Sequence, residues 1–243
     1  SGSIGDIFSA ILSQTKMHIT VVKGYELPKT VGKNSLVVIT SVSGNTVEAL
    51  SILEQTKKID CNVIAVSSGG KIEKKCKENK IEYRKIKEYN SPRASLVSFI
   101  YSMLNILEFI IPIKKEEIIE SLEKIKQLEN QISSNNLTDS NQSLKLAKEI
   151  LGIPLIYYPW GLQAAAIRFK NSLQENAKMH AMMEDVVESS HNGIVAWEKK
   201  SNVFPILLQG GDDNIKTKER WKVLKYYFKS NKIEYKEVLS VKG

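Results

Sequence analysis

The sequence predicts an α/β protein made of two tandem domains, each with a doubly wound parallel sheet. Short apolar segments rich in Val and Ile alternate with longer segments of helical spacing along the 243 residues. Such alternation is typical of parallel strands whose two faces are covered by helices. It runs through residues 1–132, stops in the polar stretch 133–141 and then starts again. The first domain is therefore predicted over residues 1–132 and the second over residues 143–243.

The first domain begins with a short helix and then alternates strands with helices. Its predicted strands are apolar runs, and its predicted helices carry apolar residues three and four positions apart. The apolar run from Leu96 to Ile113 is interrupted by polar residues such as Ser98 and Glu108. It is therefore predicted to be a core helix and not a membrane span. In chain order we expect helix 7–12, strands 17–23 and 36–40, helix 47–58, strand 62–67, helix 71–79, strand 82–87, and helices 93–110 and 116–131.

The second domain repeats this alternation after the polar linker. Pro154–Tyr158 is an apolar strand candidate, and Gly210-Gly211-Asp212 is a turn signal. In chain order we expect helix 143–151, strand 154–158, helix 164–182, strand 203–209, helix 217–230 and strand 235–241.

Both ends of the chain look cut. The opening segment Ser1-Gly2-Ser3-Ile4-Gly5-Asp6 enters a helix, although a turn of this kind normally closes a strand. At the other end, strand 235–241 stops without a covering helix. We therefore expect the first domain to lack its N-terminal part and the second its C-terminal part.

The net charge of +8 comes from 35 Lys and Arg residues against 27 Asp and Glu residues, and only four of the basic residues are Arg. These lysines are spread along the chain, whereas a nucleic-acid surface would concentrate Arg and Lys with aromatic residues. We therefore expect no nucleic-acid partner, and the charge is compatible with an anionic substrate.

The cysteine pattern gives no sign of a metal or disulfide framework. Cys61 and Cys76 form no C-x-x-C pair and have no His nearby. This usage fits a reducing cytoplasm. No signal peptide or membrane span is recognisable. We predict a cytoplasmic protein with no cofactor, no bound metal and no membrane partner.

A strand–turn–helix junction is the most informative local feature. The strand 36–40 runs into Ser41-Val42-Ser43-Gly44-Asn45-Thr46, and a helical pattern starts at Val47. Gly44 allows a tight turn, and the first helical N–H groups have no partner within the helix. Hydroxyl groups and the positive end of the helix dipole favour a phosphate group there. The loop has no Lys and is not a nucleotide-triphosphate P-loop. It predicts a seat for one phosphate, although a plain N-capping turn has the same appearance.

Three further residues are candidates for chemistry. Arg93 follows Pro92 at a helix start, where a cation is electrostatically misplaced unless it serves another partner. Glu175 lies late in the helix 164–182, where apolar packing could raise its pKa toward that of a general base. His191 opens a polar turn, where its ring could pass a proton near neutral pH. Ordinary surface roles remain open for Arg93 and Glu175, and a structural hydrogen bond remains open for His191.

In combination, these motifs resemble the archaeal bifunctional phosphoglucose/phosphomannose isomerases, which consist of two tandem sugar isomerase (SIS) domains. The resemblance covers essentially the whole chain and rests on motifs that occur in the family's order. They are Ser1-Gly2-Ser3-Ile4-Gly5-Asp6, Ser41-Val42-Ser43-Gly44-Asn45-Thr46, Pro92-Arg93-Ala94-Ser95, Arg168-Phe169-Lys170-Asn171, Glu175-Asn176-Ala177-Lys178 and His191-Asn192.

The resemblance implies a role for each candidate residue. Arg93 would stabilise an enediolate, Glu175 would move a proton between C1 and C2 of the sugar, and His191 would assist ring opening from the other subunit of a homodimer. The substrate phosphate would be held by Ser1, Ser41, Ser43 and Thr46. A catalytic Lys would lie close to or beyond Val241.

The implied activity is that of an intramolecular oxidoreductase of glycolysis and gluconeogenesis. Such an enzyme interconverts fructose 6-phosphate with glucose 6-phosphate, and with mannose 6-phosphate, through a cis-enediol and without metal. Two alternatives stay open: a non-catalytic SIS protein that senses phosphosugars, and an amino-sugar isomerase domain of a larger synthase. The presence of Glu175 and His191 favours an enzyme, because a sensor needs no base.

Overall fold

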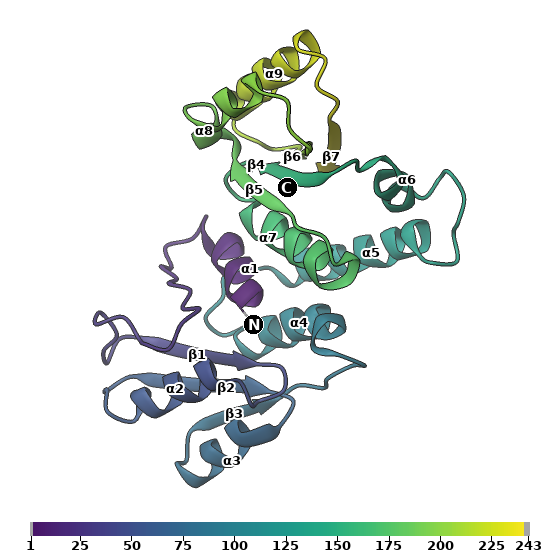
Figure 1. Ribbon diagram of the computed structural model, residues 1–243. Helices are drawn as coiled ribbons and strands as arrows, with labels where there is room; N and C mark the ends of the chain where they lie inside the picture. The colour runs from purple at the N-terminus through teal and green to yellow at the C-terminus, as the bar shows by residue number, and fades with distance from the viewer. Residues whose placement is uncertain (1, 241–243) are drawn as a thin grey trace. The chain divides into compact units, whose positions relative to one another are not determined.

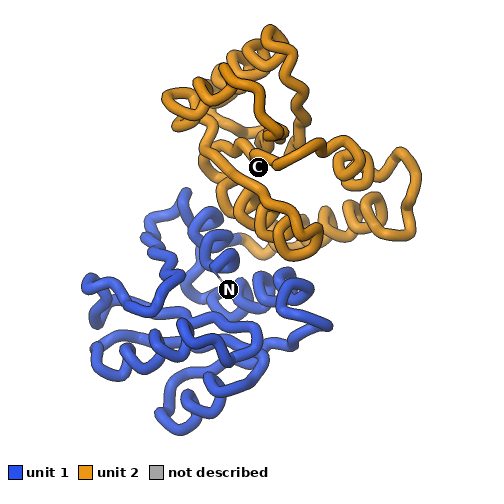
Figure 2. The backbone as a smooth tube through the Cα atoms, viewed as in Figure 1, with its two compact units in different colours: residues 1–113 blue, residues 114–243 orange. Residues whose placement is uncertain are grey.

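A computed structural model describes residues 2–240 of the chain. The chain divides into two compact units, residues 1–113 and residues 114–243 (Figure 2). Each unit is an α/β unit with its own parallel sheet (Figure 1). The division differs from the predicted boundary, because the helix at 116–131 packs against the next helix and is grouped with the second unit. The limits of the two predicted SIS domains, 1–132 and 143–243, stay a prediction.

The first unit has a three-stranded parallel sheet in the order β1-β2-β3. Figure 1 shows helices α2 and α3 on one face of this sheet and helices α1 and α4 on the other. The core between the sheet and α2 and α3 includes Ile39, Leu53 and Ile72. The elements are α1 (Gly2–Leu12), β1 (Leu36–Ser41), α2 (Val47–Thr56), β2 (Asn62–Ser67), α3 (Gly70–Glu78), β3 (Glu82–Lys85), a 3₁₀ turn (Pro92–Ser95) and α4 (Leu96–Ile106).

The strand predicted at 17–23 is wrong, because this segment pairs with none of the described strands. The segment packs along α1 instead. Lys23 Nζ lies 2.7 Å from a carboxylate oxygen of Asp6, and a Cβ atom at Gly5 would meet a methyl group of Val21 at 2.8 Å. An apolar alternation becomes a strand only where a neighbouring strand supplies hydrogen bonds. The local sequence pattern does not show whether such a neighbouring strand is present.

The second unit has a four-stranded parallel sheet in the order β5-β4-β6-β7. Its elements are α5 (Lys115–Ile132), α6 (Gln142–Glu149), β4 (Ile153–Tyr158), α7 (Gln163–Ser172), a π turn (Leu173–Ala177), β5 (Met182–Asp185), α8 (Val186–Ser189), a 3₁₀ turn (Gly193–Glu198), β6 (Val203–Gly210), α9 (Ile215–Ser230) and β7 (Lys236–Ser240).

The central strand β4 sends its side chains alternately to two cores, as the period of two residues in a strand requires. Tyr157 packs with Phe228 of α9 in one core. Ile156 packs with Ala166 of α7 in the other. Both faces of this sheet are therefore covered, which confirms the predicted α/β class with parallel sheets. None of the helices within residues 2–240 is long and apolar enough to cross a membrane.

The helix predicted at 164–182 ends ten residues early, and a strand was missed. Helix α7 stops at Ser172, a π turn follows, and Lys178 takes a left-handed φ of 58°. The chain then forms β5, which pairs with β4 so that Met182 lies opposite Leu155. A left-handed residue ends a helix because it reverses the backbone direction. Lysine gives no sequence signal for this conformation, as a glycine would.

Candidate phosphate loop and proton-transfer residues

The predicted phosphate loop joins β1 to α2 in the first unit. Gly44 has a φ of 68°, in the left-handed region that favours glycine. Its N–H lies 3.1 Å from both the carbonyl oxygen and the hydroxyl oxygen of Ser41. The Thr46 hydroxyl donates to the Ser41 hydroxyl at 3.0 Å. The loop is therefore a tight turn organised around the Ser41 side chain.

The predicted phosphate ligands differ in how accessible they are. Ser41 is fully buried, so in this conformation its hydroxyl organises the loop and does not face solvent. Ser43 is half-buried and Thr46 is exposed. Thr46 is the N-cap residue of α2, yet its side chain makes no capping bond to the helix. The first N–H groups of α2 are thus left for another acceptor. Ser1 lies outside the described residues.

A strand–helix loop of the second unit, between β6 and α9, has side-chain acceptors for N–H groups of its own. Asp213 Oδ2 accepts from the Gly210 N–H at 3.1 Å and from Trp221 Nε1 at 2.9 Å. The side chain of Asn214 caps α9 by accepting from the Lys216 N–H at 2.9 Å. A carboxylate at this position repels a phosphate. Of these two loops, the one in the second unit contains a carboxylate, whereas the one in the first unit offers hydroxyl and N–H groups. The loop of the first unit is therefore the one of the two that is suited to an anion.

Arg93 lies on the exposed surface of the 3₁₀ turn Pro92–Ser95, which leads into α4. The turn is fixed by Ser95, whose buried hydroxyl lies 2.9 Å from the Ser91 carbonyl oxygen and 2.9 Å from the Tyr89 nitrogen. The predicted helix start at Arg93 is thus a 3₁₀ turn, and the α-helix begins at Leu96.

Glu175 lies in the π turn that follows α7. Lys178 Nζ donates to the Glu175 carbonyl oxygen at 2.7 Å. The Glu175 side chain is exposed, so the predicted apolar shielding is not found within the second unit. Single π turns are frequent at functional sites, because they displace a side chain from the regular helical position.

His191 lies in the exposed turn between α8 and the 3₁₀ turn Gly193–Glu198. Its N–H donates to the Glu188 carbonyl oxygen at 2.9 Å, and Asn192 Nδ2 donates to the Glu188 side chain at 3.0 Å. Topology separates His191 from Glu175. Glu175 precedes β5 and His191 follows it, so they lie toward opposite ends of this strand.

Glu184 is a half-buried residue with a buried carboxylate oxygen, Oε2, that sequence reasoning missed. It lies on β5 opposite Tyr157, and its Oε2 has no hydrogen-bond partner among the described residues. Burial raises the pKa of Glu184 above its usual value of 4.5. Burial is also the main cause that raises the pKa of Tyr157, whose hydroxyl oxygen accepts from Trp197 Nε1 at 2.8 Å. Because strand β5 was not predicted, no pattern pointed to Glu184.

Within the described residues, no group of three or more His, Cys, Asp or Glu side chains could hold a metal ion. The loop after β2, residues 68–69, was also missed as part of the site. It touches the phosphate loop directly, as described below.

The chain is similar in sequence to proteins named as phosphoglucose and phosphomannose isomerases. Residues 139–243 match the family model described as bacterial phospho-glucose isomerase C-terminal SIS domain. The bifunctional phosphoglucose/phosphomannose isomerase of Aquifex aeolicus (strain VF5) is 31% identical over 214 residues, which are 86% of this chain and 63% of that protein. The enzyme of the same name from Pyrobaculum calidifontis is 31% identical over 205 residues, which are 82% of this chain and 60% of that protein.

A solved structure agrees with the fold. The tagatose-6-phosphate ketose/aldose isomerase of Escherichia coli superposes with a TM-score of 0.70 at 14% identity and covers 98% of this chain and 66% of that one. The chain thus spans less than two thirds of the length of the curated relatives named above, at 63% and 60%.

Proposed function

Because this chain is a relative of the bifunctional phosphoglucose/phosphomannose isomerases, we propose that it acts as an aldose–ketose isomerase on hexose phosphates. It would interconvert fructose 6-phosphate with glucose 6-phosphate and with mannose 6-phosphate. The observation that carries this proposal is the loop 41–46 with the uncapped start of α2, which offers N–H groups and hydroxyls to a phosphate. A cytoplasmic location is part of the proposal and is supported by the two free cysteines.

We assign the steps of the reaction to particular residues. The phosphate group binds at the loop through Ser43, Thr46 and the α2 N–H groups, with Ser41 organising the turn. Glu175 takes the proton from one of the carbons C1 and C2 and returns it to the other, through a cis-enediol. Arg93 stabilises the negative charge that develops on the enediolate oxygen. His191 assists the opening of the sugar ring.

A homodimer with His191 donated from the partner subunit is part of the proposal. It is supported by the topology of the second unit, in which Glu175 and His191 lie toward opposite ends of strand β5. Residues separated in this way can still serve one reaction when two copies of the chain supply one residue each.

The direct test is isomerisation in D₂O. Incubation with fructose 6-phosphate and EDTA, followed by NMR, should give glucose 6-phosphate that carries deuterium at C2. Mannose 6-phosphate would appear in the same spectra if both epimers are made. Binding of fructose 6-phosphate without any turnover would instead indicate a sensor.

Glu175→Gln tests the assignment of the base. The amide cannot accept the proton, so kcat should fall on the order of 10²–10⁴-fold or more. Binding of fructose 6-phosphate should stay within about twofold, because the change leaves the phosphate loop intact. Glu219→Gln, at an exposed position on α9, is the matched control and should keep full activity. Joint loss of binding and rate in Glu175→Gln would argue against a base at this position.

A further inference from the structure

We propose that Tyr83 and Ser67 are positioning residues for the phosphate loop, because they hold the Gly69 carbonyl group in place against Gly44. The inference deepens the proposed function and rests on it where substrate affinity is concerned. The effect of Tyr83 and Ser67 on the rigidity of the loop is a property of the first unit, and it can be tested without any substrate.

The loops after β1 and β2 are in direct backbone contact. A Cβ atom at Gly44 would lie only 1.8 Å from the Gly69 carbonyl oxygen and 3.0 Å from Ser67 Oγ. The Ile72 N–H of α3 donates to the Gly44 carbonyl oxygen at 3.0 Å. The position of Gly44, at the tightest point of the phosphate loop, is therefore set by the neighbouring loop.

Three more hydrogen bonds join these segments on either side of Gly44. The Ser68 N–H donates to the Val42 carbonyl oxygen at 2.9 Å, and the Ser68 hydroxyl lies 2.6 Å from the same oxygen. The Lys71 N–H donates to Asn45 Oδ1 at 3.0 Å. Val42, Gly44 and Asn45 are thus each tied to the segment 68–72.

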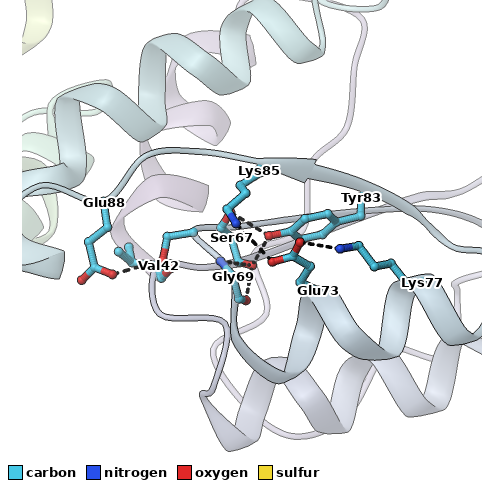
Figure 3. Close-up of polar contacts among 9 residues, drawn as sticks. Val42, Ser67, Gly69, Glu73, Lys77, Tyr83, Lys85 and Glu88 are labelled. Carbon is cyan, nitrogen blue, oxygen red and sulfur yellow. Dashed lines mark hydrogen bonds and ion pairs between the residues drawn. The ribbon is translucent and has the colours of Figure 1, made fainter.

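Ser67 and Tyr83 fix that segment from the sheet (Figure 3). Ser67 is fully buried, and its hydroxyl donates to the Gly69 carbonyl oxygen at 2.8 Å. The Tyr83 hydroxyl, which comes from β3, lies 3.1 Å from both Ser67 Oγ and the Ser67 carbonyl oxygen. Since the one hydroxyl hydrogen of Ser67 is used on Gly69, Tyr83 acts as the donor to Ser67. The resulting chain of bonds runs from Tyr83 through Ser67 to Gly69.

The surroundings keep the Tyr83 hydroxyl protonated. Burial is the main cause that raises the pKa of Tyr83 above its ordinary value of 10. Nearby Glu73 adds to the rise, and this carboxylate is itself paired with Lys77 at 2.7 Å and Lys85 at 3.4 Å. Tyr83 therefore remains a donor throughout the neutral range.

The hydrogen bonds of Tyr83 and Ser67 should affect phosphate binding, because they fix the loop before the ligand arrives. A phosphate held by backbone N–H groups needs those groups to point at one place before it arrives, and a loop free to move loses affinity to ordering entropy. Gly44, Gly69 and Gly70 all have positive φ, and glycine restricts the backbone less than any other residue. The backbone bonds between the loops supply part of the rigidity, and the Tyr83 and Ser67 side chains add to it by holding the Gly69 carbonyl group.

The test uses Tyr83→Phe, Ser67→Ala and the double variant, with Tyr226→Phe at an exposed position on α9 as control. Amide hydrogen exchange should become faster at residues 42–46 and 68–70 in each variant, and stay unchanged in β1 and in Tyr226→Phe. The effects of the two substitutions should not add, because both cut the same chain of bonds.

The kinetic readout is the KM for fructose 6-phosphate, which should rise about three- to tenfold while kcat stays within about twofold. Unchanged exchange at 42–46, or faster exchange throughout the first unit, would overturn the bracing role. A wild-type chain that neither binds nor converts fructose 6-phosphate would count against the proposed function, while hydrogen exchange would still decide the role of Tyr83 and Ser67.

Discussion

At the scale of single residues, Gly44 is the described glycine at which an added Cβ atom would meet the closest neighbour. It combines a φ of 68° with the close approach of the Gly69 carbonyl oxygen. Gly44→Ala should lower the free energy of unfolding by roughly 1–3 kcal/mol, because backbone atoms of one loop must move. Thermal unfolding of the variant measures the effect. Gly24→Ala is the matched control, since a Cβ atom there has open space around it, and equal melting temperatures for the two variants would contradict the expectation.

Glu184 gives a prediction about pH. Its folded-state pKa lies above the usual value of 4.5, so the folded state favours the neutral carboxyl group. The stabilising effect of this preference is present below pH 4.5 and is lost as the pH rises through the folded-state pKa. Glu184→Gln should therefore flatten the fall of stability from pH 4.5 toward neutrality. Urea unfolding across this range would test it, with Glu198→Gln as a control, and identical pH slopes would count against the assignment.

At the scale of elements, an ion-pair cluster joins α2 to α3. Glu54 of α2 lies 2.7 Å from Lys57 Nζ and 2.5 Å from Lys75 Nζ of α3. Hydrogen bonds from Lys57, and then from Lys75, lower the pKa of Glu54 to about 2. The side chain is 44% exposed, so solvent screening limits the contribution to less than about 1 kcal/mol.

The pH dependence of this cluster has the opposite sign to that of Glu184. Its stabilising contribution is present above pH 4.5 and is lost as the pH falls from 4.5 toward 2. Glu54→Gln should remove that part of the acid sensitivity, as measured by thermal unfolding between pH 5 and pH 3. Salt near 1 M should reduce the difference between the variant and the wild type, because these groups are exposed. A difference that persists at high salt would mean that Glu54 acts through packing.

How much of the fold could be predicted depends on which forces specify each element. Strand β2 was predicted at its observed bounds, and the bounds of the other buried strands were predicted to within one or two residues. These strands could be predicted because a short apolar run indicates burial on both faces of a sheet. Strand β5 was missed, since it is short, partly exposed and specified by pairing with β4. The same dependence on a neighbour explains why segment 17–23 was wrongly predicted as a strand.

The site was predictable to the same degree. The phosphate loop could be predicted from Gly44, Ser41 and Ser43, because a glycine turn before a helix is recognisable in the local sequence. The hydrogen bonds from Tyr83 to Ser67 and from Ser67 to Gly69 could not be predicted in this way. Tyr83 is far from Ser67 in the sequence, and the two come together only because β2 and β3 pair in the sheet. The exposed environment of Glu175 likewise depends on the π turn after α7, which ends at the left-handed Lys178.

At the scale of the whole molecule, the proposed dimer can be tested by mixing inactive chains. Glu175→Gln and His191→Ala homodimers should each be inactive. If one subunit supplies Glu175 and the other His191, each mixed dimer regains one intact site of two. Refolding the variants together in equal amounts should then restore about a quarter of wild-type activity. Failure to recover any activity, with mixed dimers shown to form, would place both residues in one subunit or outside the site.

The uncapped start of α2 has a consequence for the life of the protein in a cell. The side chain of Asn214 caps the first turn of α9, whereas the side chain of Thr46 does not cap α2. An anion bound in the loop would therefore accept the hydrogen bonds of the first N–H groups of α2. A ligand that fills this role adds stability in proportion to the logarithm of its concentration. The abundance of such a protein would then follow the supply of this ligand, since chains that have lost it unfold more often and reach proteases first. The ligand would in this way set the lifetime of the protein that binds it.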